Sequence, residues 1–330
     1  MIATIFEKGQ GLGNQLWVYC AGKAIAEKYN QEYIVFDPEN FKGHHFLEID
    51  VSNSRSSKSL DSNFTSDEWD VLNEECFWDD DLKCFSTDYD SRVENINKNT
   101  IIRGCFQSEK YFYGFPEKLK SYIKLKDSYL NETLVDESTC VINIRGGEYK
   151  RHKNLILPDS YWTNAIENMK NIHGISNFIG VSDDDSYFKE VLPDIDILPG
   201  SMEHDFTVLY QSKFAIISNS SFGYFPSKLG SKKKCVIAPQ HWGRFNNSFE
   251  RWASPCNLYS DWMWQDSNGR LKNYDQCIGI CKETMDYYSS NFNIRTSSVA
   301  VDKNLRSYIP APIRSLVKRI LSILLPKKFG

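Results

Sequence analysis

The sequence predicts an α/β protein with two parallel β-sheets, one in each half of the chain. Short apolar runs of strand length recur along the chain, and segments with the apolar spacing of helices separate them. This alternation restarts after a polar stretch at residues 131–138 that is typical of a linker. With 330 residues, the chain is long enough for two domains of ordinary size. We therefore expect two Rossmann-like domains, at residues 1–135 and 136–265, that face each other across a cleft.

The first half opens with a strand–helix–strand unit. A glycine-rich turn at residues 9–14 follows the first apolar run, and apolar residues then recur at helical spacing as far as Ile25. A further helix is expected from Pro116 to Tyr129. Residues 52–91 are rich in acids and have weak periodicity, so we interpret them as helices or loops with a solvated face, and a rim that contacts the acceptor is the alternative. The predicted strands of this half are residues 3–6, 33–36 and 101–104.

The second half repeats the alternation of strands and helices. Asp159 and Ser160 stand where a helix begins, and apolar residues at helical spacing follow them. Residues 183–185 are three aspartates at the start of another expected helix. Aspartates in such a run can bind Mg²⁺, but helix capping is their commoner use, so we expect no metal site. The predicted strands are residues 140–144, 178–181, 214–217 and 235–239.

The bulk composition excludes some classes of protein. The net charge of -4 gives no indication of a nucleic-acid partner. Nine cysteines are scattered without a close CxxC pair, which is typical of reduced thiols in the cytoplasm rather than of a disulfide framework. No apolar run is long enough to span a bilayer. We therefore expect a cytoplasmic protein.

The glycine-rich turn also allows an alternative interpretation. It follows a strand and opens a helix, as a dinucleotide-binding turn does, and Asp37 stands where a ribose would be bound. Gly13, however, lies one position before the third glycine of that pattern, and Asn14 occupies the position itself. Asn14 and Gln15 place two amides at the sheet edge, and amides suit hydrogen bonds with hydroxyls. Because the turn still lies between a strand and a helix, an NAD-dependent oxidoreductase remains an alternative.

A buried strand at residues 140–144 ends at Arg145, which two glycines and Glu148 follow. In an open α/β sheet, ligands bind beyond the carboxyl ends of the strands. An arginine in that position can bind a phosphate through two hydrogen bonds. A simple strand-to-turn joint with a surface ion pair is the alternative for this segment.

Several segments, in order, resemble the bacterial α-1,2-fucosyltransferases of glycosyltransferase family 11. Residues 11–16 resemble the family's G-L-G-N-Q motif, and residues 106–112 are similar to its F-Q-S-E-K-Y-F. Residues 143–149 lie where the family has H-x-R-R-G-D-Y. Further similarity lies at residues 181–184, 203–206, 217–222 and 236–242.

The resemblance implies a GT-B architecture and an inverting, metal-independent transfer of fucose from GDP-fucose. The second domain would hold the nucleotide. The acceptor would be an oligosaccharide precursor of a surface polysaccharide or lipopolysaccharide, either free or lipid-linked. Three positions depart from the motif: Asn143 replaces histidine, Gly146 replaces the second arginine, and Glu148 replaces aspartate. Loss of one cation beside a diphosphate keeps two alternatives open, another nucleotide sugar as donor or a non-catalytic glycan-binding protein.

Departure of a diphosphate requires positive charge or oriented N–H donors. Arg145 would supply the charge, and residues 219–221, at the start of a helix, would supply N–H groups, although plain helix capping also explains them. Glu148 and His152 are candidates for the base that activates the acceptor hydroxyl. The expected catalytic residues are Arg145, Glu148 and Asn14. The expected donor-binding residues are Arg145, Asp205, Asn219, Ser220, Ser221, Phe222, Gly13 and Gln15.

The carboxyl-terminal residues 309–330 are predicted to form a basic amphipathic helix. Apolar residues recur there at helical spacing, and five lysines and arginines accompany them. Such a helix suits an anionic membrane surface, so we expect peripheral attachment to the inner face of the cell membrane. Packing on the second domain or on another subunit is the alternative. Residues 266–308 are an extension without an assigned role.

Overall fold

The computed structural model describes residues 1–61, 66–79, 84–113, 117–152, 155–230, 232–246, 250–252, 257–291 and 295–297. The amphipathic helix expected at residues 309–330 lies outside these ranges. Within them, every helix is too short or too polar to cross a membrane.

A five-stranded parallel sheet forms the centre of the first half, in the order β4-β2-β1-β8-β5. Helix α1 (Leu12–Lys28) packs closely on this sheet, since a Cβ atom on Gly22 would lie 2.5 Å from the Thr4 side chain. The three strands predicted for this half are confirmed within one residue. The five strands are β1 (Ile2–Ile5), β2 (Tyr33–Phe36), β4 (Ser54–Arg55), β5 (Asp70–Asn73) and β8 (Thr100–Arg103).

Two predictions for the first half are wrong. The acidic segment contains strands, because β5 joins the parallel sheet while β6 (Glu75–Asp79), β7 (Cys84–Thr87) and β17 (Arg295–Ser297) form an antiparallel sheet. The helix after Pro116 is also shorter than expected. Only α2 (Glu117–Tyr122) is helical, and β9 (Ile123–Leu125) then pairs with β3 (Leu47–Ile49). In β9 the two apolar residues are buried and the lysine between them is exposed, which is the alternation of a strand.

The second half contains a seven-stranded sheet in the order β12-β11-β10-β13-β14-β15-β16. All neighbouring strands are parallel except β15 and β16. The four predicted strands are confirmed, and three more extend the sheet. The strands are β10 (Thr139–Ile144), β11 (Asn177–Ser182), β12 (Asp196–Ile197), β13 (Phe214–Ile217), β14 (Cys235–Pro239), β15 (Met263–Gln265) and β16 (Leu271–Lys272). The helices are α3 (Asp159–His173), α4 (Asp185–Val191), α5 (Met202–Gln211) and α6 (Ser221–Leu229).

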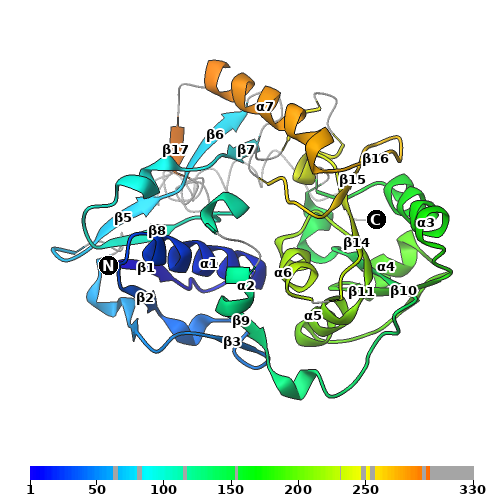
Figure 1. Ribbon diagram of the computed structural model, residues 1–330, viewed down its shortest axis with the longest axis horizontal. Coiled ribbons are helices and arrows are strands. Elements are labelled where there is room, and N and C mark those ends of the chain that lie inside the picture. Colours follow the sequence, from blue (N-terminus) through cyan, green and yellow to red (C-terminus); the bar gives the residue numbers. More distant parts are fainter. Residues whose placement is uncertain are drawn as a thin grey trace, which may run out of the picture.

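The two halves lie side by side, and the extension after the second sheet returns to the first half (Figure 1). Helix α7 (Tyr274–Asn291) buries Cys277, Cys281, Thr284 and Tyr288 along one face. The Tyr288 hydroxyl donates to Asp79 of β6 at 2.8 Å, and β17 pairs with the same strand. The described part of the extension therefore joins the two halves.

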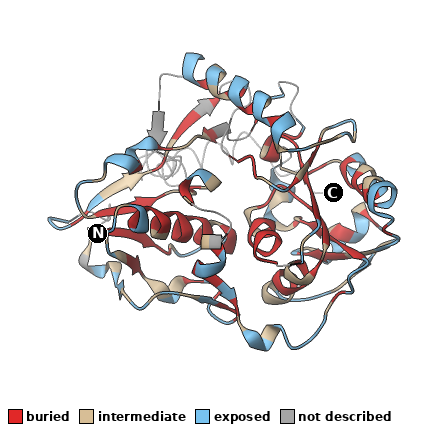
Figure 2. Ribbon diagram, viewed as in Figure 1, coloured by how far each residue is buried: buried red, intermediate tan, exposed pale blue. Residues whose placement is uncertain are grey.

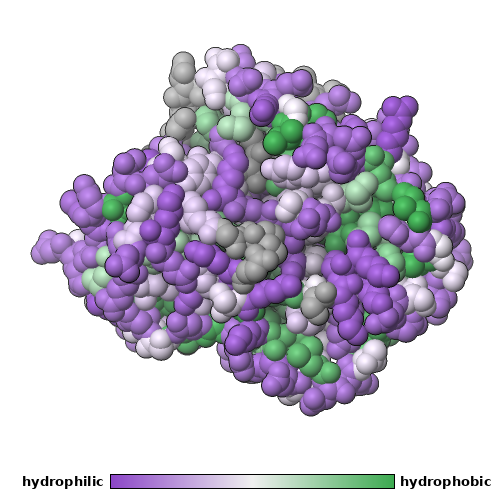
Figure 3. All heavy atoms as spheres, in the orientation of Figure 1, coloured by the Kyte–Doolittle hydropathy of each residue, from purple (hydrophilic) through white to green (hydrophobic). Residues whose placement is uncertain are grey.

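Aromatic side chains fill the interface between the halves. The Trp17 ring on α1 lies 4.2 Å from the Tyr224 ring on α6 and 5.6 Å from the Tyr259 ring, measured between centroids. Both helices are largely buried in Figure 2. Burial of such large rings is strongly stabilising, so the interface fixes how the halves face each other. The outer face drawn in Figure 3 is mostly hydrophilic, with apolar residues in small groups.

Seven short 3₁₀ helices connect these elements within the described residues. They are η1 (Pro38–Asn40), η2 (Ser57–Ser59), η3 (Ser91–Asn95), η4 (Glu109–Tyr111), η5 (Asp127–Tyr129), η6 (Gly147–Arg151) and η7 (Trp242–Arg244).

Candidate active site

A cleft of about 870 Å³ lies between the two halves. The first half contributes residues from the start of α1, together with Lys42 and Gln107. The second half contributes the carboxyl ends of β10, β11 and β13 and the residues that follow them. The cleft thus lies where α/β sheets ordinarily bind ligands.

The amino-terminal ends of α1 and α6 meet at this cleft. A Cβ atom on Gly13 would lie 2.5 Å from the carbonyl carbon of Ser221, so only glycine allows the two helices to approach this closely. The side-chain oxygen of Asn14 accepts hydrogen bonds from Ser221 Oγ and from Gln107 Nε2, each at 2.8 Å. Because a helix amino terminus carries partial positive charge, the two ends together favour an anion.

Arg145 follows β10 and lies against the wall of the cleft. Its Nη1 atom is 3.1 Å from Asp183 Oδ2, and its Nη2 atom is 3.8 Å from Glu148 Oε1. Its Nε atom has no hydrogen-bond partner among the described residues. The guanidinium is therefore held in place while keeping a donor available.

The neighbouring Gly146 leaves no room for a side chain. A Cβ atom there would lie 2.7 Å from the Tyr187 ring and 2.8 Å from Asp184 Cβ. The Gly146 N–H group donates to Asp183 Oδ1 at 2.9 Å, which fixes the turn. A cation at this position would require Tyr187 and Asp184 to move.

Two buried polar side chains that line the cleft lack hydrogen-bond partners. Asp205, on α5, is 6% exposed, and its Oδ1 atom has no hydrogen-bond partner in the described part of the chain, although His204 Nδ1 lies 3.7 Å from it. Burial, with smaller contributions from Asp185 and Asp183, raises the pKa of the Asp205 carboxyl to about 7. Both amide atoms of Asn219 are likewise unpaired and buried. Buried polar groups are normally satisfied, so these atoms are suited to a bound ligand.

The model of glycosyl transferase family 11 matches residues 52–266 of this chain. The chain belongs to this family. No curated protein matches it. The two parallel-sheet halves facing across a cleft are the GT-B architecture that was predicted.

Solved structures show distant similarity to this family 11 chain. NodZ alpha-1,6-fucosyltransferase co-crystallized with GDP is 14% identical, with 68% of this chain and 91% of that chain covered and a TM-score of 0.41. POFUT1 in complex with GDP-fucose is 11% identical, with 72% and 96% covered and a TM-score of 0.38. Escherichia coli (E. coli) heptosyltransferase WaaC with ADP is 11% identical, with 88% and 100% covered and a TM-score of 0.43.

Most of the predicted site residues of this family 11 protein line one cleft. Ser220 caps α6, since its side chain accepts from the Phe222 N–H group at 3.3 Å, so the capping interpretation is confirmed and the residue also faces the cleft. The cleft-lining residues among those predicted are Gly13, Asn14, Arg145, Glu148, Asp205, Asn219, Ser220, Ser221 and Phe222.

Gln15 lies elsewhere. It is fully buried and does not line the cleft, and its Nε2 atom donates to the Asn40 carbonyl at 2.8 Å while its Oε1 atom accepts from the Lys42 N–H group at 2.9 Å. Both polar atoms of the Gln15 amide therefore form hydrogen bonds with residues 40 and 42, and these bonds position the segment that carries Lys42 to the cleft. His152 is exposed and does not line the cleft.

The aspartate run at residues 183–185 serves the protein itself. Asp184 caps α4 by accepting from the Tyr187 N–H group at 3.0 Å, as predicted, and Asp183 pairs with Arg145. A hydrogen bond from Lys150 lowers the pKa of Asp184 to about 2. Within the described ranges, no group of three or more histidine, cysteine, aspartate or glutamate residues could hold a metal ion.

Sequence reasoning missed Lys42 and assigned no role to Gln107. Lys42 lies outside the motifs, and the hydrogen bonds of Gln15 to residues 40 and 42 help to place it at the cleft. Gln107 stands inside a motif of the family resemblance, and that motif was the available signal.

Proposed function

We propose that this protein is an inverting, metal-independent fucosyltransferase that uses GDP-fucose. It transfers fucose in α-1,2 linkage to a hydroxyl of an oligosaccharide precursor of a surface polysaccharide or lipopolysaccharide. The observation that carries this proposal is the meeting of two helix amino termini with Arg145 at one cleft of a family 11 chain. The motif resemblance supports the linkage and the donor.

The leaving group requires stabilisation of negative charge. The bond from the sugar anomeric carbon to the diphosphate oxygen breaks as the acceptor oxygen bonds to that carbon, and GDP departs with the electron pair. The Arg145 guanidinium and the N–H groups at the start of α6 offset this charge. Of the described residues that line the cleft, Lys42 is the other cation, so we assign it to the diphosphate in place of the arginine missing at Gly146.

The nucleobase is assigned to the second half. A guanine edge carries two adjacent N–H donors, and an ionised carboxylate can accept from both. Asp205 offers such a carboxylate in a buried position, and the lack of a hydrogen bond to its Oδ1 atom supports this role. Uracil and adenine lack the same pair of donors, so Asp205 would select GDP over UDP and ADP.

The acceptor hydroxyl loses its proton as the new bond forms. We assign the proton to Glu148, whose side chain is 70% exposed at the cleft. Asn14 is placed to hydrogen-bond the donor or the acceptor hydroxyl, since its Nδ2 atom is not used in the contacts with Gln107 and Ser221. No metal ion is needed if the cations and helix ends carry the leaving charge.

We also propose that the protein works in the cytoplasm at the inner face of the cell membrane. The basic apolar pattern of residues 309–330 supports this location. A chain truncated after Tyr308 should leave the membrane fraction and keep its activity on soluble acceptors. An unchanged membrane fraction would contradict the proposed attachment.

Calorimetric titration with GDP, UDP, CMP and NAD, with and without Mg²⁺, tests the proposed donor. We expect GDP to bind and the other three to bind at least tenfold more weakly, with no dependence on Mg²⁺. A preference for UDP would favour a related transferase with another donor, an outcome that Gly146 keeps open. Binding of NAD alone, or of no nucleotide, would overturn the proposal. Binding of acceptor without transfer from GDP-fucose would identify a glycan-binding protein.

A further inference from the structure

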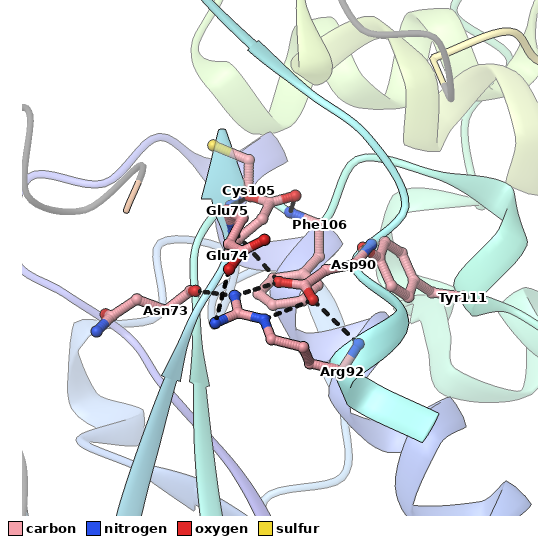
Figure 4. Close-up of polar contacts among 8 residues, drawn as sticks. All are labelled: Asn73, Glu74, Glu75, Asp90, Arg92, Cys105, Phe106 and Tyr111. Carbon is pink, nitrogen blue, oxygen red and sulfur yellow. Dashed lines mark hydrogen bonds and ion pairs between the residues drawn. The ribbon is translucent and has the colours of Figure 1, made fainter. Parts of the chain in front are cut away.

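The loop that follows β8 is built around one buried carboxylate. Glu74, directly after β5, is 1% exposed. Its Oε2 atom accepts from the Cys105 N–H group at 2.7 Å, and its Oε1 atom accepts from the Phe106 N–H group at 3.1 Å (Figure 4). A Cβ atom on Gly104 would lie 2.4 Å from Glu74 Cβ, so the loop fits closely around this side chain.

The two hydrogen bonds stabilise an unfavourable backbone. Phe106 has a φ angle of 47°, in the left-handed region that bulky residues rarely occupy. Such a conformation costs about 1 kcal/mol or more and persists where its surroundings impose it. Both oxygens of Glu74 accept from the N–H groups of Cys105 and Phe106, so the carboxylate helps to impose this conformation.

No cation accompanies the Glu74 carboxylate in the described part of the chain. Arg92 lies nearby but pairs with Asp90 and Glu75 (Figure 4). A buried carboxylate without a cation is costly for folding. Burial accordingly raises the pKa of Glu74 to about 7, although the two N–H groups act in the opposite direction. An acid in this position destabilises the fold, which points to a role in the site.

The loop leads directly to the cleft. Gln107 follows Phe106, and its Nε2 atom donates to Asn14 at 2.8 Å. The same Asn14 oxygen accepts from Ser221 of the second half. A continuous set of contacts therefore runs from Glu74 through the loop backbone and Gln107 to the point where the two halves meet.

We propose that Glu74 is a positioning residue for the transfer reaction. Its carboxylate sets the conformation of residues 104–107 and so holds Gln107, and through it Asn14, in place at the cleft. This inference rests on the proposed function, because it assigns Asn14 to the reacting hydroxyl or donor. The side chains assigned to GDP, namely Arg145, Asp205 and Lys42, lie outside residues 104–107, so Glu74 affects turnover rather than GDP binding.

The test compares Glu74→Gln with Asp90→Asn in the full-length protein. A glutamine has the same shape but only one oxygen, so one of the two N–H groups loses its acceptor. Asp90 is a matched control, because it is a buried acid of the same cluster. Its hydrogen bonds go to Glu75, Arg92 and Tyr111 and to none of residues 104–107. We expect Glu74→Gln to lower kcat at least tenfold, with the Kd for GDP within twofold of the wild type and faster hydrogen exchange of residues 104–107. Asp90→Asn should keep kcat within threefold.

Equal losses of kcat in the two variants would overturn the inference, as would a normal kcat in Glu74→Gln. If Glu74→Gln does not fold, Gln107→Ala removes only the far end of the same contacts and must give a similar loss of kcat with unchanged GDP binding. Wild-type turnover in Gln107→Ala would then reject the inference. Failure of the wild-type protein to bind GDP or transfer fucose would instead contradict the proposed function, whereas the hydrogen-exchange result tests the loop independently.

Discussion

Glu109 of the first half and Lys228 of the second half form a largely buried ion pair, with Glu109 Oε1 lying 2.9 Å from Lys228 Nζ. The side chains are 15% and 5% exposed. The Glu109 carboxylate also accepts from the hydroxyl of Tyr224 at 2.9 Å and from the N–H group of Ser260 at 3.3 Å. One carboxylate in η4 thus binds α6 and the segment that follows β14, so it connects the halves close to the cleft.

Replacement of Glu109 by alanine should destabilise the protein. Lys228 would keep a buried charge without this partner, and removal of one member of a buried pair costs about 3 to 5 kcal/mol. Urea unfolding of the wild type and Glu109→Ala measures the difference. Asp70→Ala is the control, because its pair with Lys98 is exposed and should contribute less than about 1 kcal/mol. Similar losses of unfolding free energy in both variants would show that the buried pair of Glu109 and Lys228 contributes no more than an exposed pair.

Replacement of Arg145 by alanine should lower kcat about a hundredfold or more, equivalent to about 3 kcal/mol of transition-state stabilisation. The reason is the loss of one of the two cations that line the cleft among the described residues. Steady-state fucosyl transfer measures the effect, with Arg151→Ala as a control because Arg151 is exposed and does not line the cleft. Turnover of Arg145→Ala close to that of the wild type would remove this residue from the mechanism.

The sequence predicted the parallel strands because they bury apolar residues in uninterrupted runs, as in the fully buried β13. It did not predict β5 and β6, because Asp70, Glu74, Glu75 and Asp79 interrupt the apolar pattern. Two of these acids, Glu74 and Asp79, are buried and bonded to groups far along the chain. Periodicity cannot distinguish an acid that points into a polar cluster from one that faces water.

Contacts between residues far apart in the sequence also limit prediction of the site. Asp205, Asn219 and Arg145 follow or adjoin strands of one sheet, so sequence order indicates that they lie at one edge. The role of Gln15 depends on its contact with Asn40, 25 residues away, and local patterns carry no signal for such a contact.

Replacement of Lys42 by alanine should weaken GDP binding about five- to tenfold. An exposed cation that approaches a diphosphate contributes a charge interaction, which salt screens. Calorimetry at low and high salt measures this effect, and the difference between wild type and Lys42→Ala should shrink as salt rises. Lys124→Ala serves as a control, since this exposed lysine lies on β9 and does not line the cleft. An unchanged Kd in Lys42→Ala would leave Arg145 as the sole described cation assigned to the diphosphate.

The raised pKa of Asp205, about 7, predicts a pH dependence of donor binding. In the proposed complex the ionised carboxylate accepts from the guanine N–H groups, so affinity should be highest above pH 7 and fall about tenfold between pH 8 and pH 6. GDP-fucose is the suitable ligand, because its diphosphate does not titrate in this range. Asp205→Asn should bind weakly and show little change between these pH values. An equal pH dependence in both proteins would exclude Asp205 as its origin.

The raised pKa of Asp205 also makes the stability of the fold depend on pH. Folding favours the protonated carboxyl, whereas donor binding favours the ionised one. The folded-state pKa lies above the ordinary value of 3.8, so the folded protein holds this proton more tightly than the unfolded chain does. The contribution of Asp205 to stability is therefore greatest below pH 3.8 and declines as pH rises to about 7. Asp205→Asn cannot ionise, so its melting temperature relative to the wild type should increase from pH 5 to pH 8. A constant difference in melting temperature across that range would contradict the raised pKa. The predicted trend, together with weaker GDP-fucose binding by Asp205→Asn, would indicate that Asp205 is retained for ligand recognition at the expense of stability.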